Sequence, residues 1–172
     1  MNPPPRAARR DWAPRVLPSH RFLLLLAAAA LLFPVSAPGA LATDALLLLL
    51  FAADAFMAPR ALRVERRAPR RVSLGAESDV AISVRNEGTR PVRALVTDDL
   101  PPILARLDGD VRELAIRPGH TEVAAYRFRA DRRGDEVFGD VHLRVMGPLG
   151  LAWRQRRVPR ADEVRVQPGV AE

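Results

Sequence analysis

Three histidines are the side chains best suited to metal binding or proton transfer at neutral pH. His20 falls in an N-terminal tail, His120 in an expected turn, and His142 at an outward position of an expected strand. No second histidine or glutamate stands at the spacing of a metal site. A general base would also need a paired carboxylate or nucleophile, which the sequence does not show. We therefore expect neither a metal site nor a catalytic histidine.

Other catalytic groups are equally hard to find. The sequence has no cysteine, which excludes a thiol nucleophile, a disulfide framework and a thiolate metal site. No glycine-rich phosphate loop occurs. The serines lack the G-x-S-x-G setting of a nucleophile elbow: Ser19, Ser36, Ser73, Ser78 and Ser83. We expect no enzyme activity and no cofactor.

Two sets of charged residues could bind ions. The adjacent Arg132 and Arg133 could hold a carboxylate or a phosphate, although we expect them to brace a loop or face solvent. Four aspartates could bind calcium if their loops converged, but their spacing matches no known calcium loop. They are Asp98, Asp99, Asp108 and Asp110.

One long apolar stretch, from Phe22 to Pro59, organises the chain, and only Asp44 and Asp54 interrupt it with charge. A membrane-spanning helix needs about 20 apolar residues. Pro34, Pro38 and Gly39 divide the stretch, which favours a turn. The sequence therefore predicts a two-helix transmembrane hairpin, with helices over 22–36 and 40–58. Both are short, so tilt or local thinning of the bilayer would absorb the mismatch.

Arginines on both sides of the stretch predict its orientation. Positive charge stays on the cytoplasmic side of a membrane, and the turn between the two helices has none. We expect a protein of the bacterial plasma membrane with both termini cytoplasmic. The flanking arginines are Arg6, Arg9, Arg10, Arg15 and Arg21 before the hairpin, and Arg60, Arg63, Arg66, Arg67, Arg70 and Arg71 after it.

A cleaved signal peptide is the alternative interpretation. The arginine-rich start, the leucine-rich core and the small residues Ala40-Leu41-Ala42 are typical of an export signal with a cleavage site. Cleavage would make the rest an exported or anchored extracytoplasmic binding domain. The second apolar run and the arginine cluster that follow at once favour the hairpin.

Asp54 lies inside the apolar stretch, where a carboxylate costs about 2.5–3.5 kcal/mol. It precedes Arg60 by about a turn and a half of helix. We expect it to snorkel to the interface or pair with that arginine. A contact between helices or subunits is the alternative. Asp44 is expected beside the turn.

From Val72 onward the sequence alternates with a period of two, which indicates β-strands. Asn86-Glu87-Gly88-Thr89 is typical of a hairpin turn. About seven to nine short strands predict an immunoglobulin-like antiparallel β-sandwich. No Cys…Trp…Cys spacing is present. The expected domains are a disordered basic tail over 1–20, the hairpin over 21–59 and the sandwich over 60–172.

The net charge is +7 and every basic residue is an arginine. Much of this charge adjoins the apolar stretch, where anionic lipid attracts it. Nucleic-acid binding would call for stacking aromatics and a recognition motif. The sequence has six Phe, two Trp and one Tyr, and no such motif. We expect the lipid bilayer as a partner and no nucleic acid.

An ordered string in the second half, R-R-G-x3-F-G-x3-L-R-x2-G-P-L-G-L, carries a family resemblance. Together with Asp54 at the end of the hairpin, it resembles the N-terminal half of the domain-of-unknown-function-58 family of bacterial membrane proteins. The string consists of Arg132, Arg133, Gly134, Phe138, Gly139, Leu143, Arg144, Gly147, Pro148, Leu149, Gly150 and Leu151.

The resemblance covers about residues 20–168 and implies partners. Members of that family are often encoded beside MoxR-type AAA+ ATPases and transglutaminase-like membrane proteins. They usually continue into a region similar to a von Willebrand factor A domain, whereas this sequence ends at Glu172. We expect a fragment, a truncated product or a short relative. The function expected is that of a non-catalytic, membrane-anchored scaffold that presents a cytoplasmic β-sandwich.

Overall fold

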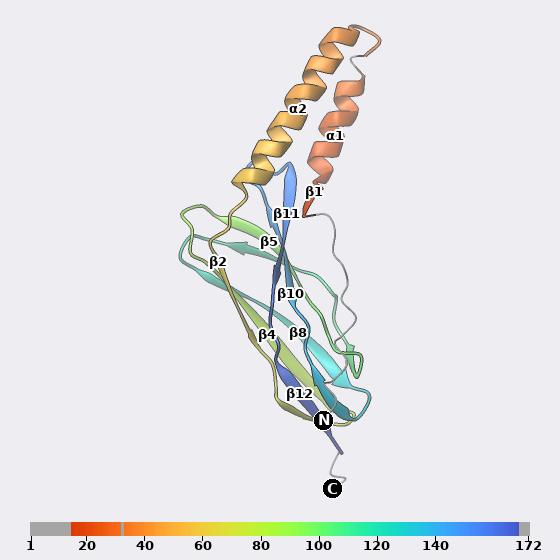
Figure 1. Cartoon of the computed structure of the whole chain (residues 1–172), viewed down its shortest axis with the longest axis vertical. Helices are drawn as coiled ribbons and strands as arrows, with labels where there is room; N and C mark the ends of the chain where they lie inside the picture. Colours follow the sequence, from red (N-terminus) through yellow and green to blue (C-terminus); the bar gives the residue numbers. More distant parts are fainter. Residues whose placement is uncertain (1–14, 32, 169–172) are drawn as a thin grey trace. The chain divides into compact units, whose positions relative to one another are not determined.

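A computed structural model describes residues 15–31 and 33–168 (Figure 1). The chain divides into two compact units. Of the described residues, 61–143 and 157–168 form unit 1, and 15–31, 33–60 and 144–156 form unit 2. The chain passes between the units within strands β10 (Val141–Met146) and β11 (Ala152–Val158).

Unit 1 contains a four-stranded antiparallel sheet with the strand order β2-β4-β8-β6. Two ten-residue strands form its centre, and shorter strands flank them. The sheet consists of β2 (Leu62–Arg67), β4 (Glu77–Asn86), β8 (Thr121–Ala130) and β6 (Leu104–Arg106).

In a second layer of unit 1, β5 (Val92–Asp98) lies between two strands. These are β7 (Arg112–Ile116) on one side and the first residues of β10 on the other. A three-stranded sheet has the order β3-β12-β9, with β3 at Arg71–Ser73, β12 at Glu163–Gln167 and β9 at Gly134–Val137. Strands β3 and β12 run parallel, whereas the sequence predicted antiparallel pairing throughout.

Each layer buries alternate residues, because a strand points successive side chains to opposite faces. The rings of Phe128 and Phe138 meet edge to face with centroids 6.2 Å apart. The predicted antiparallel β-sandwich is therefore present in unit 1. Its buried residues include Val80, Ile82, Val84, Val92, Ala94, Val96, Ile116, Ala124, Tyr126, Phe128 and Leu143.

The predicted hairpin turn at residues 86–89 is wrong. Strand β4 pairs with β2 and β8, while β5 pairs with β7, so the segment carries the chain from one sheet to the other. Asn86 is fully buried and its side chain organises the crossing. Its Nδ2 donates to the carbonyls of Arg90 and Ile116, and its Oδ1 accepts from the Gly88 N–H.

Unit 2 contains helices α1 (His20–Ala30) and α2 (Ala37–Met57), which lie side by side (Figure 1). Strand β1 (Val16–Pro18) pairs antiparallel with β11. The predicted tail is therefore ordered at this strand, and its first 14 positions lie outside the described residues. Pro38 was predicted to turn the chain. It lies instead at the start of α2, where Ser36 caps the helix and a proline costs no hydrogen bond.

A buried charge network joins three strands of unit 1. The Arg66 side chain on β2 is fully buried, and its Nη1 donates to Asp98 Oδ1 at 2.6 Å. Its Nε donates to Asp162 Oδ2 at 2.8 Å. The Tyr126 hydroxyl donates to Asp98 Oδ2 at 2.6 Å, and the Arg106 guanidinium lies 3.9 Å above the tyrosine ring. Arg66 was counted as a membrane-flanking charge, but it is a core residue of the β-sandwich.

Burial raises the pKa of Tyr126 above its usual value of 10, and the adjacent Asp98 carboxylate raises it further. Burial also raises the pKa of Asp98. The charge of Arg66 and the hydrogen bonds that Tyr126 and Arg66 donate to this carboxylate oppose that shift. A tyrosine with a raised folded-state pKa stabilises the fold fully below its unfolded pKa. That contribution is lost as the pH rises through the folded-state pKa.

We predict that Tyr126→Phe lowers the free energy of unfolding by about 1–3 kcal/mol at neutral pH, because a buried carboxylate oxygen loses its donor. Denaturant titration of the full chain in detergent measures this loss. Thr121→Val is the matched control, since it removes an exposed hydroxyl from the same strand. An equal loss in both variants would contradict the assigned role.

Tyr126 is the one tyrosine in the sequence, which also contains no lysine and no cysteine. We therefore predict that phenolate absorbance stays absent at pH 10 in the folded protein and develops with unfolding above that pH. The loss of stability above pH 10 should be smaller in Tyr126→Phe. Normal titration of the folded protein near pH 10 would contradict this prediction.

Candidate membrane-anchoring site

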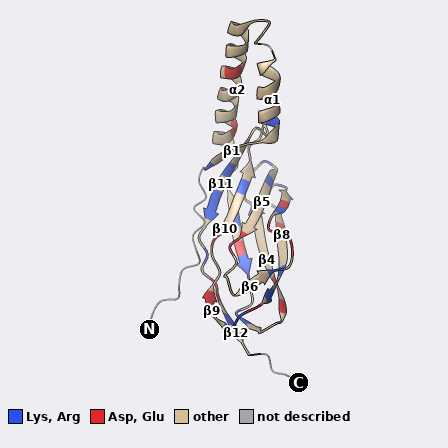
Figure 2. Cartoon of the chain, turned by 90° about the vertical axis from the view of Figure 1, so that its right-hand side faces the viewer, with Lys and Arg blue, Asp and Glu red and all other residues tan. Residues whose placement is uncertain are grey.

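The two helices of unit 2 present a large apolar surface. Figure 2 shows them almost free of charged residues, and Asp44 and Asp54 are the only charges between Phe22 and Pro59. Helix α2 has 21 residues and is about 30 Å long, enough to cross the hydrocarbon core. Its exposed residues include Leu41, Leu46, Leu48, Leu49 and Phe56, and those of α1 include Leu23, Leu24 and Leu25.

This exposure distinguishes α2 from the core helix of a soluble domain. Only 17% of its most apolar window is buried within the structure. Among the described residues, α2 is the one helix long and apolar enough to span a membrane, by length and composition alone. Helix α1 has 11 residues, too few to span. The predicted hairpin of two spanning helices is therefore not confirmed.

The carboxylate of Asp54 joins helix α2 to a later turn of unit 2 through hydrogen bonds. Asp54 is fully buried near the end of α2. Its Oδ1 accepts from the Leu149 N–H at 2.6 Å, and its Oδ2 accepts from the N–H groups of Leu151 and Ala152 at 2.7 and 2.9 Å. Three donors on one buried carboxylate offset its desolvation. We call residues Gly147–Ala152 the anchor turn.

The pairing of Asp54 with Arg60 that the sequence predicted does not occur. The Arg60 guanidinium donates to the Phe56 carbonyl at 3.3 Å and lies 5.1 Å from the centre of the Phe56 ring. Asp54 instead joins residues almost one hundred positions later in the chain. No helical spacing could reveal this contact, because its donors are backbone groups of the anchor turn.

Two glycines of the anchor turn are required for different reasons. A Cβ on Gly147 would overlap the Asp54 carboxylate, so this position needs a residue without a side chain. Gly150 has a φ of 73°, in the left-handed region that glycine adopts without strain. The sequence predicted turn glycines here, and the structure adds that Gly147 serves close approach to a buried charge.

Ser19 ties the start of α1 to the same turn. Its Oγ donates to the Gly150 carbonyl at 2.7 Å and accepts from the Phe22 N–H, which caps the helix. Its N–H donates to the Leu151 carbonyl at 2.8 Å. The beginning of α1 and the end of α2 are thus fastened to one turn.

Unit 2 also contains a hollow of about 410 Å³. Four arginines contribute to its lining, together with Pro59, Val145 and Gln155. The arginines are Arg15, Arg60, Arg154 and Arg156. Among the residues that the structure describes, no acidic side chain lines it. The end of an apolar helix therefore adjoins concentrated positive charge.

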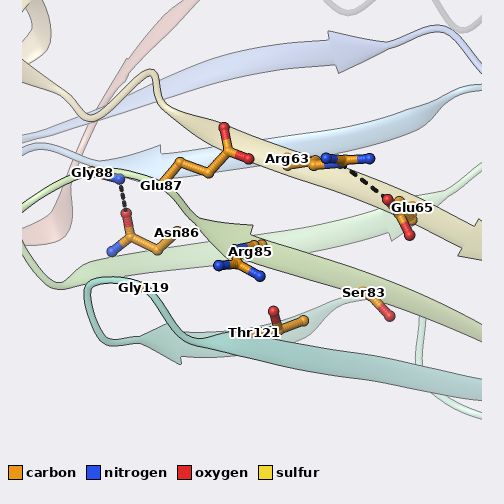
Figure 3. A pocket seen from close by; sticks show the side chains of 9 residues that line it. All are labelled: Arg63, Glu65, Ser83, Arg85, Asn86, Glu87, Gly88, Gly119 and Thr121. Carbon is orange, nitrogen blue, oxygen red and sulfur yellow. Dashed lines mark hydrogen bonds and ion pairs between the residues drawn. The ribbon is translucent and has the colours of Figure 1, made fainter.

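A larger hollow of about 740 Å³ lies on unit 1 and has a different character (Figure 3). Arg63 and Arg85 line it together with Glu65 and Glu87, so its charges balance. Arg63 Nε lies 3.0 Å from Glu65 Oε1. This balanced and partly self-paired lining gives little selectivity for either sign of charge.

The remaining residues of the family-like string separate into the two units. Arg132 and Arg133 are exposed, as expected, and Gly134 has a φ of 152°. Phe138 and Leu143 are buried in the sandwich. Arg144 begins the portion that belongs to unit 2, which continues through Gly147, Pro148, Leu149, Gly150 and Leu151.

His142 was predicted to point outward, but it is buried. Its Nε2 lies 3.0 Å from Asp99 Oδ2, so it has a carboxylate partner that sequence reasoning missed. The sequence offers little sign of this pair, because the two residues lie far apart in the chain.

Gly139 allows close approach to Asp99, because a Cβ at this position would overlap the Asp99 side chain. A positive φ was the predicted reason for this glycine, but its φ is not positive.

The aspartates considered for calcium do not converge. Among the described residues, no group of three acidic, histidine or cysteine side chains could hold a metal.

No protein family model matches the chain, and no curated protein does. Trypsin-activated alpha-2-macroglobulin from Escherichia coli matches 63% of this chain with a TM-score of 0.50 and 16% identity. The match spans only 7% of that protein. A CARDB domain from Pyrococcus furiosus matches 64% of this chain and 90% of its own, with a TM-score of 0.43 and 14% identity. A human ASH/PapD-like domain matches 63% of this chain and 87% of its own, with a TM-score of 0.38 and 18% identity. At these identities, the match to the Escherichia coli protein shows a β-domain fold alone.

We predict that Asp54→Asn destabilises unit 2 by about 2–3 kcal/mol, because the amide group cannot accept from every N–H of the anchor turn. Asp44→Asn in the same helix is the matched control. One oxygen of Asp44 is buried without a described partner, so its neutralisation should cost little. Trp153 fluorescence, in a Trp12→Phe background, follows unfolding of β11 in detergent. Equal destabilisation by the two variants would contradict the role of Asp54.

Proposed function

We propose that the chain is a non-catalytic, membrane-anchored protein that presents an immunoglobulin-like β-sandwich for protein–protein interaction. The leucine-rich surface of α2 carries this proposal. In water, such a surface would promote aggregation or recruit a partner, whereas in a bilayer it is solvated. Figure 2 gives the charge distribution that supports this environment for the helices.

The attachment of the helices supports anchoring over export. Cleavage at Ala40–Ala42 would remove β1, α1 and Ser19, which all contact residues of β11 or the anchor turn. It would also cut α2 close to its start. The export signal therefore fits the structure less well than a retained anchor.

We place the β-sandwich on the cytoplasmic side. Arginines precede α1 and follow α2, and the segment between the helices has no charge. The positive-inside rule then places both flanks in the cytoplasm of a plasma membrane. Since α1 is too short to span, local thinning of the bilayer must accommodate it.

The resemblance to the domain-of-unknown-function-58 family agrees with this proposal. Asp54 and the sequence G-P-L-G-L both carry the resemblance, and they contact each other in unit 2. By that resemblance, a MoxR-type AAA+ ATPase and a transglutaminase-like membrane protein are the proposed partners. No described strand pairs with the outer edge of β7, which offers backbone groups for strand addition.

Cysteine labelling tests the topology, because the sequence contains no cysteine. Val35 lies between the helices and is 85% exposed, and Val123 on β8 is 53% exposed. We predict that a membrane-impermeant maleimide labels Val35→Cys in intact cells and labels Val123→Cys only after permeabilisation.

The two valine variants serve as controls for each other. Labelling of Val123→Cys from outside would overturn the cytoplasmic placement and favour export. Recovery of the full chain in the soluble fraction would overturn membrane anchoring itself.

Crosslinking from β7 in intact membranes then tests the proposed protein–protein interaction. An absence of specific crosslinked products would contradict that role.

A further inference from the structure

The anchor turn exposes two apolar residues at its tip, Pro148 and Leu149. Leu149 is 48% exposed and Pro148 is exposed beside it, whereas the other four residues of the turn are buried. A single exposed leucine is common on protein surfaces and needs no explanation by itself. The surroundings of the tip within unit 2 therefore decide whether it has a role.

Hydrogen bonds fix the level of this tip along helix α2. The Leu149 N–H donates to Asp54 Oδ1 at 2.6 Å. Asp54 lies about 4.5 Å before the last residue of α2, Met57, at the rise of an α-helix. Phe56 and Met57 lie beyond that level, and both expose apolar side chains. The tip is therefore beside the apolar surface of the helix and does not extend past its end.

Every N–H group of the anchor turn has an acceptor within unit 2. Asp54 accepts three of them. The N–H groups of Gly147 and Gly150 donate to carbonyls of the turn itself at 2.8 and 3.0 Å, and Pro148 has no N–H. Ser19 also donates to two carbonyls of the turn. Irregular backbone enters an apolar environment only when its polar groups are satisfied within the protein, so this turn is suited to one.

We propose that Pro148 and Leu149 insert into the interfacial region of the bilayer and form a membrane contact separate from the helices. This inference rests on the proposed membrane anchoring through α2. The exposed tip continues the apolar surface of that helix, which favours lipid over a docking protein. The contact holds the adjacent ends of β10 and β11 at the membrane surface.

A basic side chain beside the turn indicates how deep the tip lies. A Cβ on Gly150 would be 3.3 Å from Arg21 Nη1, so the Arg21 guanidinium adjoins the turn. An apolar side chain next to a cationic group matches the boundary between acyl chains and headgroups, where the charge reaches water or phosphate. The insertion is therefore shallow.

Depth-dependent fluorescence quenching of the full chain in lipid vesicles tests this proposal. Because the sequence contains no cysteine, Leu149→Cys carries a single environment-sensitive label. The vesicles contain phosphatidylcholine and phosphatidylglycerol, with a nitroxide either near the headgroup end of the acyl chain or near its methyl end. We expect blue-shifted emission, most of which is lost to the shallow nitroxide and less to the deep one.

Val123→Cys is the matched control, because Val123 is 53% exposed but lies on β8 of unit 1. Its label should emit as in water, and neither nitroxide should quench it. Equal quenching at the two positions would overturn the proposal in favour of general contact with lipid. Unquenched emission from Leu149→Cys would overturn it as well. If that emission is blue-shifted but unquenched, a protein surface covers the tip instead of lipid.

Leu48→Cys, near the middle of α2, reports the proposed anchor separately. The deep nitroxide should quench its label most strongly. Quenching of Leu48→Cys without quenching of Leu149→Cys would overturn the insertion of the turn alone. Quenching at neither position would overturn membrane anchoring, and the insertion with it.

A second variant avoids the attached label. The sequence has two tryptophans, Trp12 and Trp153, and Leu149→Trp in a background with both changed to Phe contains one indole at the tip. Phosphatidylcholine brominated near the headgroup end of its acyl chains should quench this indole. If the labelled Leu149→Cys protein misfolds, an unquenched indole in Leu149→Trp overturns the proposal.

Discussion

The buried carboxylate of Asp54 is the constraint on which unit 2 depends. A charge in an apolar helix is tolerated only where donors replace the water it has lost. Here three backbone N–H groups do so, and all three belong to the anchor turn. Because the charge cannot be left without partners, the end of α2 and the anchor turn must remain together.

The same principle operates in unit 1 with a different set of partners. Arg66 on β2 forms an ion pair with Asp98 at the end of β5, and the Tyr126 hydroxyl on β8 donates a hydrogen bond to the same carboxylate. The network joins strands from both layers of the sandwich. Breaking one member of such a network leaves a buried charge, so these groups position strands more strictly than apolar packing alone.

Several elements could be predicted because their signals are local. The alternation of Val80, Ile82 and Val84 reflects the pleat of a single strand, and these residues are buried. Strand β5 ends at Asp98, as the prolines after it indicated. The turn at 86–89 was misjudged because its residues permit a hairpin and a crossing between sheets equally well. Only strand pairing distinguishes the two, and pairing depends on residues far away in the chain.

By itself, the sequence determined the apolar stretch, the period-two strands and the glycine-containing turns, because each depends on neighbouring residues. Tertiary structure alone decided the partners of Asp54, His142 and Arg66, and the gathering of four arginines around one hollow. Those contacts join segments tens of positions apart, often through backbone groups that every residue carries. Side-chain identity therefore contains little information about them until the chain has folded.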